Sequence, residues 1–390
     1  MKILITSDWN DLAVNGVATS VKNLRRSLEE RGHEVRVLTL SQNRRSWQRD
    51  GVMYLGSLPM GRIYPGARLL TALAGKWVRE IIGWKPDIVH SQCEFSTFFL
   101  ARRIADELDI PLVHTYHTVY EDYTHYFSPS RRLGKKAVAT LSRRIAAMTD
   151  DMIVPTEKVR RLLLGYGVRT PIHVVPSGID LGRFRGSRSE AFVREQREKL
   201  GIPQERKILV YVGRLAEEKN LEEMLRFRAN MGGDSITLLI VGGGPWKERL
   251  ENAAAQLGLQ APDVVFAGMV PPETVASWYQ MGDLFVSAST SETQGLTYVE
   301  ALAAGTPALC RADECLEGVI LEGENGWQYR TEEEFRQRVE EFFAAPEKKE
   351  AMSAAARAVA EEYSAERFGQ RAEAIYAARI QKQGKVVISA

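Results

Sequence analysis

The chain alternates short apolar runs with stretches in which apolar residues recur every three or four positions. KILITSD at 2–8 and DLFVSAS at 283–289 have the length and composition of buried strands, whereas Val17, Val21 and Leu24 form the stripe of an amphipathic helix. Strands that alternate with helices in this way predict parallel sheets covered by helices on both faces. The pattern therefore favours a doubly wound α/β protein.

The alternation restarts near the middle of the chain, at RKILVYV (206–212), which predicts two such domains. We expect one doubly wound domain at 1–178 and a second at 200–362, with ligands in a cleft between them. The polar stretch GSRSE places the linker at about 176–200. A long helix within 363–390 is expected to pack back on the first domain.

The most informative stretch is 287–307, which reads SASTSETQGLTYVEALAAGTP. A strand precedes it and a helical pattern follows Gly295, so this glycine falls at a strand-to-helix turn. Thr293 or Gln294 is expected to cap the helix, and Gly305 to end it. Backbone N–H groups and the positive end of the helix dipole point outward at such a turn, which predicts an anion site.

Two carboxylates flank this turn, Glu292 before the helix and Glu300 within it. Helical rise places them about 8–10 Å apart, too far to share a proton but close enough to contact one polyhydroxylated ligand. A ligand with diols at both ends and phosphates between them is a nucleotide sugar. The alternative is an acid that complements the helix dipole together with one solvated helical glutamate.

Arg214 and Lys219 follow another predicted strand, in the loop GRLAEEKN. A planar guanidinium and a compact ammonium together suit a pyrophosphate. The alternative is that both are surface cations paired with Glu217 or Glu218.

Two residues of the first half also follow predicted strands. Gly16 lies between the first strand and the first helix, where a missing Cβ would let a phosphate approach the backbone. A turn glycine is the alternative, because the spaced glycines of a dinucleotide fingerprint are absent. His117 follows the carboxyl end of a strand, which predicts that it lines a pocket.

Residues 128–149 predict a basic amphipathic helix. Its expected apolar stripe is Leu133, Ala137, Leu141, Ile145 and Met148. Opposite this stripe lie the expected membrane contacts Arg131, Arg132, Lys135, Lys136 and Arg143, whereas Arg144 falls near the stripe edge. Such a helix can bind an anionic membrane surface, and the alternative is a core-facing helix with a solvated basic face.

Composition narrows the classes of protein. The 390 residues are 44% hydrophobic and 26% charged, which is ordinary for a globular protein. No apolar run is long enough for a membrane span, and the first residues read as a strand rather than a signal peptide. Three scattered cysteines predict neither a disulfide framework nor a metal site, so we expect a reducing cytoplasm.

Charge is distributed unevenly along the chain. Residues 1–180 carry 26 Lys and Arg against 18 Asp and Glu, and the remaining residues carry 26 against 32. This asymmetry predicts different partners for the two halves. No nucleic-acid-binding motif is present, so nucleic acid is not expected to be one of them.

Taken together, these motifs resemble the retaining glycosyltransferases of family 4, whose GT-B fold has two Rossmann-like domains. The resemblance covers essentially the whole chain. It is carried by NGVATSV, HTVYEDY, PSGID, GRLAEEKN, VGGGPWKERLE, FAGMV and above all SETQGLTYVEALAAGTP. The last of these is similar to the family's motif of two glutamates eight positions apart. The loop before the first helix departs from the pattern, with Ala13 and Val14 where the family often carries a proline.

The resemblance implies a role for each candidate residue. Arg214 and Lys219 would neutralise the pyrophosphate of a nucleotide-sugar donor, and Glu292 would contact its sugar hydroxyls. Glu300 would bind the ribose diol, and His117 would lie beside the sugar. The remaining donor contacts would come from Gly16, from the backbone around Met269, and from the N–H groups of Gln294, Gly295 and Leu296.

The resemblance also implies retention by attack on the front face, with neither a protein nucleophile nor a metal ion or cofactor. HTVYEDYTHY and SETQGLTY look most like the branch that glucosylates diacylglycerol. We therefore expect transfer of glucose from UDP-glucose to a membrane lipid, by an enzyme peripheral on the inner face of the cell membrane. The alternatives are a soluble or polysaccharide-precursor acceptor, a nucleotide-sugar 2-epimerase, and a silent nucleotide-sugar-binding module.

Overall fold

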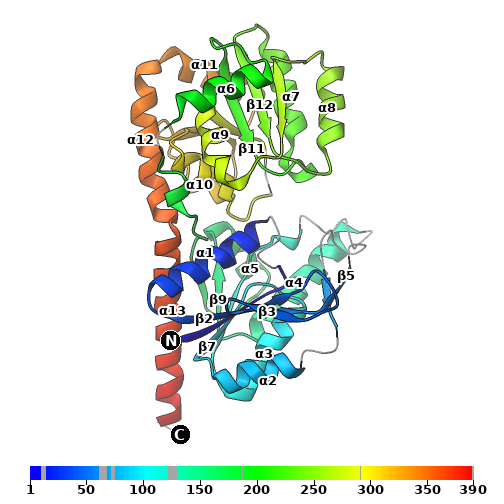
Figure 1. The fold of residues 1–390 in the computed structure, drawn as a ribbon, viewed down its shortest axis with the longest axis vertical. Helices are drawn as coiled ribbons and strands as arrows, with labels where there is room; N and C mark the ends of the chain where they lie inside the picture. Colours follow the sequence, from blue (N-terminus) through cyan, green and yellow to red (C-terminus); the bar gives the residue numbers. More distant parts are fainter. Residues whose placement is uncertain are drawn as a thin grey trace. The chain divides into compact units, whose positions relative to one another are not determined.

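The chain folds into two compact units, shown in Figure 1. The first comprises Met1–Ile179 together with the segment from Ala365 onward, and the second comprises Asp180–Ser364. This computed structural model describes residues 1–9, 15–60, 68–71, 75–121, 130–186, 188–289 and 291–388. Each unit is described below by itself.

The first unit is built on an eight-stranded sheet that is parallel except for its last pair. In spatial order its strands are β10 (Ile172–Val174), β9 (Asp151–Val154), β8 (Leu112–Thr115), β7 (Ile88–Ser91), β1 (Lys2–Ser7), β2 (Glu34–Leu40), β4 (Val52–Leu55) and β3 (Trp47–Arg49). A separate antiparallel pair joins β5 (Ser57–Pro59) to β6 (Arg68–Leu70).

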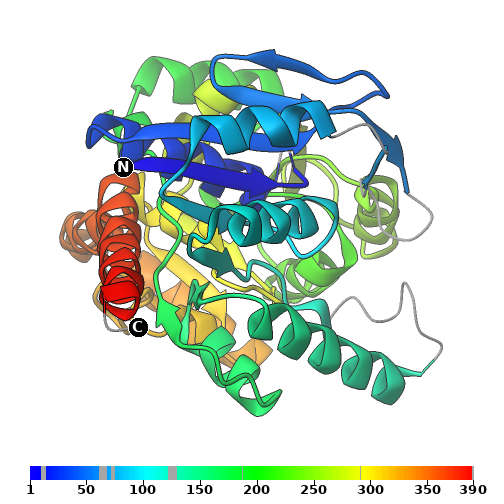
Figure 2. The ribbon, with the colours of Figure 1, turned by 90° about the horizontal axis from the view of Figure 1, so that it is seen from below.

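Helices cover both faces of this sheet. They are α1 (Gly16–Glu30), α2 (Gly75–Trp84), α3 (Ser96–Leu108), α4 (Arg131–Ala147), α5 (Glu157–Gly165) and α13 (Ala365–Ile388). Alternate residues of β1 divide the core, because Ile3 and Ile5 pack with α1 and α13 whereas Leu4 packs with α2 and α3. Figure 2 shows α2 and α3 side by side. Continuous burial of β1 is what a doubly covered parallel sheet requires.

The last helix, α13, returns the chain to the first unit and packs against α1, as Figure 1 shows. The two helices approach closely where a Cβ on Gly369 would lie only 2.2 Å from the Ser27 hydroxyl. Ion pairs fix α13 further along, from Arg31 to Glu373 and from Arg379 to Asp151. Among the described helices, α13 included, none has the length and apolarity to cross a bilayer.

The apolar stripe predicted for α4 is correct at Ile145 and Met148, which pack in the core, but wrong at Leu133 and Leu141. Leu133 and Leu141 are 64% and 40% exposed, whereas Val138 and Ser142 are buried. Ser142 lies inward because its hydroxyl is 3.3 Å from that of buried Tyr116. The packed face of α4 thus runs through Val138, Ser142 and Ile145, which leaves the two leucines on the outward side.

The second unit contains a six-stranded parallel sheet. In spatial order its strands are β13 (Val264–Gly268), β12 (Ile236–Val241), β11 (Lys207–Val212), β14 (Leu284–Ser287), β15 (Ala308–Arg311) and β16 (Gly326–Tyr329). Its helices are α6 (Glu190–Leu200), α7 (Leu221–Met231), α8 (Lys247–Gln256), α9 (Val275–Met281), α10 (Leu296–Ala303), α11 (Glu332–Ala344) and α12 (Lys349–Ala360). The stretch expected to be a linker, 176–200, contains α6, which Ser189 caps.

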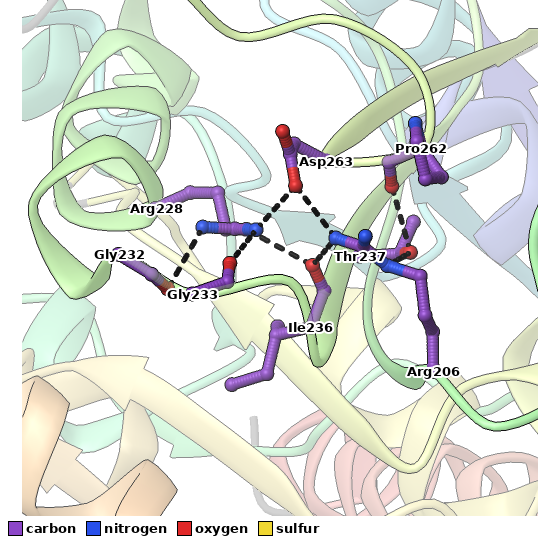
Figure 3. A network of polar contacts seen from close by, with 8 residues as sticks. All are labelled: Arg206, Arg228, Gly232, Gly233, Ile236, Thr237, Pro262 and Asp263. Atoms are coloured by element: carbon purple, nitrogen blue, oxygen red, sulfur yellow. Dashed lines mark hydrogen bonds and ion pairs between the residues drawn. The ribbon is translucent and has the colours of Figure 1, made fainter.

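A buried ion cluster closes the amino ends of three neighbouring strands in the second sheet (Figure 3). Arg206 and Arg228 each donate to Oδ1 of Asp263 at 2.6 Å. Their remaining N–H groups donate mainly to backbone carbonyls, including that of Ile236. Thr237 completes the cluster, since its hydroxyl accepts from Arg206 Nε at 3.0 Å. Every charged group is thus paired, as burial of charge requires.

Candidate functional site

The turn before α10 is a left-handed one. Gly295 has a φ of 74° and occupies the cap position, where no side chain accepts a hydrogen bond from the helix. The prediction that Thr293 or Gln294 caps the helix is therefore wrong. A Cβ on Gly295 would lie 2.3 Å from the ring of Tyr298, so only glycine fits this turn. The Tyr298 N–H donates to the Gly295 carbonyl at 3.0 Å, and the glycine has no side chain that could accept from the first N–H groups of α10.

The two predicted cations of the second unit lie in ion pairs. Lys219 ends the short 3-10 helix η3 (Glu217–Lys219), and its ammonium group donates to Glu292. Arg214 pairs with Glu218, which is one of the partners considered from the sequence. The Ser289 hydroxyl donates to the Glu218 carbonyl at 3.2 Å and so joins the two loops. The fold thus places Arg214, Lys219 and Glu292 beside the turn that begins α10.

Close backbone contacts fix the loop that carries Arg214. The Tyr211 hydroxyl donates to the Arg214 carbonyl at 3.0 Å. The glycines of VGGGP pack against the same loop, where a Cβ on Gly242 would meet the Gly213 carbonyl oxygen at 1.9 Å. These glycines are therefore needed for loop-to-loop packing.

Met269 lies at the carboxyl end of β13 and is 79% exposed. Its side chain covers Gly243, where an added Cβ would meet Met269 Cγ at 2.6 Å. The exposed Met269 side chain beside this glycine-rich loop is a suitable apolar surface for a flat ring.

Glu300 accepts a hydrogen bond from Tyr279, a residue that the sequence did not single out. The hydroxyl of Tyr279 on α9 donates to Glu300 Oε2 at 2.8 Å, and Tyr279 is fully buried. Burial raises the pKa of Glu300, while this hydrogen bond lowers it. The carboxylate is therefore fixed in one orientation, with Oε1 left for a second contact.

In the first unit, Gly16 is exposed at the first turn of α1. Asn15 caps this helix, because its side-chain oxygen accepts from the Ala18 N–H at 2.9 Å. The preceding loop at 10–14, with its departure from the family pattern, lies outside the described residues.

His117 follows β8, and its ring is held by Gln92. His117 Nε2 donates to Gln92 Oε1 at 2.6 Å, and the Gln92 amide nitrogen faces the ring of His90. Burial lowers the pKa of His117 to about 3, so the imidazole is neutral near pH 7. Gln92 follows the carboxyl end of β7, and the rule that singled out His117 would also have found it.

Two carboxyl groups that the sequence did not single out lie close by. Glu94 is buried, accepts from the Tyr120 hydroxyl, and has its other oxygen 3.4 Å from His114 Nε2. Asp8 accepts from the Thr97 N–H at 2.9 Å, and burial raises its pKa to about 6. Within the described ranges, no group of three or more His, Cys, Asp or Glu could hold a metal ion.

The cations predicted for membrane contact fall into two groups along α4. Lys135 donates to Glu121 at 2.6 Å, and Arg143 donates to the Tyr166 carbonyl at 2.9 Å, so the protein already engages both. Arg132, Lys136 and Arg144 are exposed, on the same side as Leu133. The Arg131 side chain lies outside the described residues. The outward face of α4 is therefore both basic and apolar.

Two protein-family models match the chain, one in each half. The model for Glycosyltransferase Family 4 matches residues 14–183, and the model for Glycosyl transferases group 1 matches residues 192–359.

Two similar curated proteins are alpha-monoglucosyldiacylglycerol synthases. The one from Streptococcus pneumoniae is 35% identical over 387 residues, which cover 96% of this chain and 85% of the relative. The one from Acholeplasma laidlawii is 30% identical over 395 residues, which cover 99% of each protein.

Solved structures confirm the predicted GT-B fold. Sucrose-phosphate synthase from Thermosynechococcus elongatus superposes with a TM-score of 0.75 at 19% identity, covering 96% of this chain and 98% of that one. HepE from Anabaena, solved with UDP and glucose, gives a TM-score of 0.74 at 18% identity, covering 97% and 100%.

Proposed function

The chain belongs to glycosyltransferase family 4, and on this premise we propose that it transfers glucose from UDP-glucose to a hydroxyl of a membrane lipid such as diacylglycerol. Transfer proceeds with retention of the anomeric configuration. The observation that carries the lipid acceptor is similarity to two diacylglycerol glucosylating proteins over nearly the whole chain.

Contacts in the second unit support a donor site. The diphosphate binds between the Lys219 ammonium group, the Arg214 guanidinium and the N–H groups that begin α10. The ion pairs with Glu292 and Glu218 keep both cations near this position, so little reorganisation is needed when a phosphate replaces a carboxylate. Glu292 then accepts hydrogen bonds from the sugar hydroxyls.

The nucleoside end is recognised at a distance from the reacting carbon. Glu300, oriented by Tyr279, accepts from the ribose diol, and the base lies against Met269 and the backbone beside it. These contacts are the same in the ground and transition states, so they lower KM rather than raise kcat. The two cations act differently, because negative charge develops on the departing diphosphate and their attraction grows along the reaction.

The surface of the first unit supports a lipid acceptor. The outward face of α4 combines Leu133 with exposed Arg132 and Lys136, as an interfacial helix does. A second exposed apolar area begins beside Glu94, where Phe95 and Phe99 are 51% and 58% exposed. We propose that α4 binds the anionic membrane surface, which would make the enzyme a peripheral membrane protein of the cytoplasmic face.

The test supplies UDP- and GDP-sugars with diacylglycerol in anionic vesicles, with diacylglycerol in neutral vesicles, and with soluble sugars. We expect glucosylated diacylglycerol by mass spectrometry, an α-anomer by NMR, and release of UDP that depends on anionic lipid. Turnover of soluble acceptors without an effect of lipid would remove the lipid assignment. An altered sugar that stays nucleotide-linked would instead indicate an epimerase.

The membrane role of α4 is tested with Arg132→Gln/Lys136→Gln. Each cation near an anionic surface is worth about 1 kcal/mol, so this variant should bind anionic vesicles roughly 30-fold more weakly. Arg194→Gln/Lys199→Gln on α6 removes the same charge from another exposed helix and serves as the matched control. Equal loss in both variants would point to net charge rather than to α4.

A further inference from the structure

A continuous row of buried polar side chains runs through the first unit from α13 to His117. The Tyr376 hydroxyl on α13 lies 2.5 Å from His90 Nδ1, and the Thr115 hydroxyl lies 2.7 Å from His90 Nε2. The Gln92 amide nitrogen lies 3.2 Å and 3.0 Å from these two ring nitrogens. The Gln92 oxygen accepts from His117 Nε2 at 2.6 Å.

Packing does not require this row to be polar. His90 and Tyr376 are completely buried, Gln92 is 1% exposed, and Tyr376 lies among apolar side chains of β1, α1 and α13. Burying polar groups is costly unless every one is paired, and apolar residues of similar shape would fill the same space. A row of buried polar contacts does restrict orientations, because each donor must face an acceptor of its neighbour.

The last contact of the row determines which ring nitrogen of His117 carries the proton. An amide presents an acceptor on one side and donors on the other, and here its nitrogen faces His90 and its oxygen faces His117. A neutral His117 must then carry its proton on Nε2. Reversing the amide would present donors to His117 and favour the other tautomer, with the proton on Nδ1.

We propose that Tyr376 is a positioning residue for His117 and acts through His90 and Gln92, so that docking of α13 selects the tautomer of His117. By holding the His90 ring from α13, the Tyr376 hydroxyl keeps the Gln92 amide in its observed orientation. The effect on catalysis rests on the proposed function and on the role beside the donor sugar that the family resemblance implies for His117. The effect on the tautomer does not.

The tautomer is measured by nitrogen-15 NMR of the histidine side chains. The chain has six histidines, which single substitutions can assign. We expect His117 to be protonated on Nε2 in the wild type. It should shift to Nδ1 or to a mixture in Tyr376→Phe, which keeps the ring and removes the hydroxyl, and in Gln92→Leu.

Arg379→Gln is the matched control. It lies less than one helical turn from Tyr376 and loses the ion pair between α13 and Asp151, but leaves the polar row intact. We expect it to leave the His117 spectrum unchanged. An Nδ1 proton in the wild type, unchanged spectra in the two row variants, or an equal change in Arg379→Gln would each overturn the proposal.

A double-mutant cycle gives the catalytic readout. Tyr376→Phe should lower kcat about fivefold, the scale of one neutral hydrogen bond, with little change in the KM for the donor. In a His117→Ala background the same change should have no effect on kcat, because the imidazole through which Tyr376 acts is then missing. An additive loss would overturn action through His117. The predicted tautomer shifts in a protein that transfers no sugar would instead remove the proposed function alone.

Discussion

The second unit carries two clusters of opposite charges, one at each end of its parallel sheet. At the amino ends, Arg206 and Arg228 are 6% and 3% exposed and share Asp263. At the carboxyl ends, Arg214 and Lys219 are 52% and 21% exposed and pair with separate glutamates. The chemistry is the same, but the degree of burial differs.

The other hydrogen bonds of these four cations show how the difference in burial affects each cluster. Arg206 and Arg228 also donate to backbone carbonyls, so displacing Asp263 would leave charges buried against a fixed frame. Arg214 is half exposed and Lys219 lies on a short 3-10 turn, so either can exchange a carboxylate for another anion. We infer that the first cluster serves stability and the second serves binding.

The largest effect is expected for Asp263→Ala. It leaves two buried guanidinium groups without their shared partner, which should lower the free energy of unfolding by about 3–5 kcal/mol in urea titrations. Glu222→Ala, which breaks the exposed pair with Arg249, is the control and should cost less than about 1 kcal/mol. Activity per folded molecule should be unchanged. A loss of activity would contradict the assignment of this cluster to stability alone.

Lys219→Ala and Arg214→Ala should show the opposite pattern. Each removes a group that stabilises the departing diphosphate, so the transfer rate should fall by about 10²–10³. Stability should fall less than in Asp263→Ala, because Arg214 is half exposed and the Lys219 pair is less deeply buried than the two arginines that share Asp263. Lys247→Ala, on the exposed side of α8, controls for charge. Wild-type rates in both site variants would show that the leaving-group site lies elsewhere.

Asp8 extends the comparison to a buried carboxyl group without a paired cation at its described contacts. Its pKa is raised to about 6 from 3.8, so the folded state favours the protonated form, and stability falls as the pH rises from about 4 to 6. Asp8→Asn removes this titration. The free energy of unfolding of Asp8→Asn, measured relative to wild type in denaturant titrations, should rise by about 2–3 kcal/mol between pH 4 and pH 8. If the two proteins differed in stability by the same amount at every pH, the raised pKa of Asp8 would be contradicted.

The smallest effect is expected for Gly243→Ala at the proposed base site. The new Cβ would press on Met269, whose exposed side chain can move away. The KM for the donor should therefore rise by less than about tenfold, with kcat and stability unchanged. An unaltered KM would argue that the base does not lie against Met269.

Local sequence signals predicted the elements and the turns well. The strand-to-helix turn at Gly295 follows from a strand pattern, one glycine and a helical stripe, all within a few residues. Its cap was predicted wrongly, because Thr293 and Gln294 are good cap residues but the chain turns through a left-handed glycine. The outward face of α4 was missed because Gly134, Val138, Ser142 and Ile145 recur at the same helical spacing and form the buried face instead.

Contacts between distant segments could not be predicted. Tyr376 lies 286 residues from His90, and no local pattern connects a helical tyrosine to a strand so far away. Tyr279 behind Glu300 is hidden for the same reason, since an aromatic residue on an amphipathic helix normally predicts only packing.

The position of α13 has a consequence for how the protein is made. A ribosome completes the strands of the first unit early, but the helix that supplies Tyr376 and Arg379 emerges only after the whole second unit has been translated. Until then the nascent first unit exposes the apolar side chains that Phe368 and Ala372 will cover. A protein shortened at residue 364 would therefore leave this apolar surface uncovered. The order of synthesis also delays assembly of the His117 environment until the donor-binding half exists.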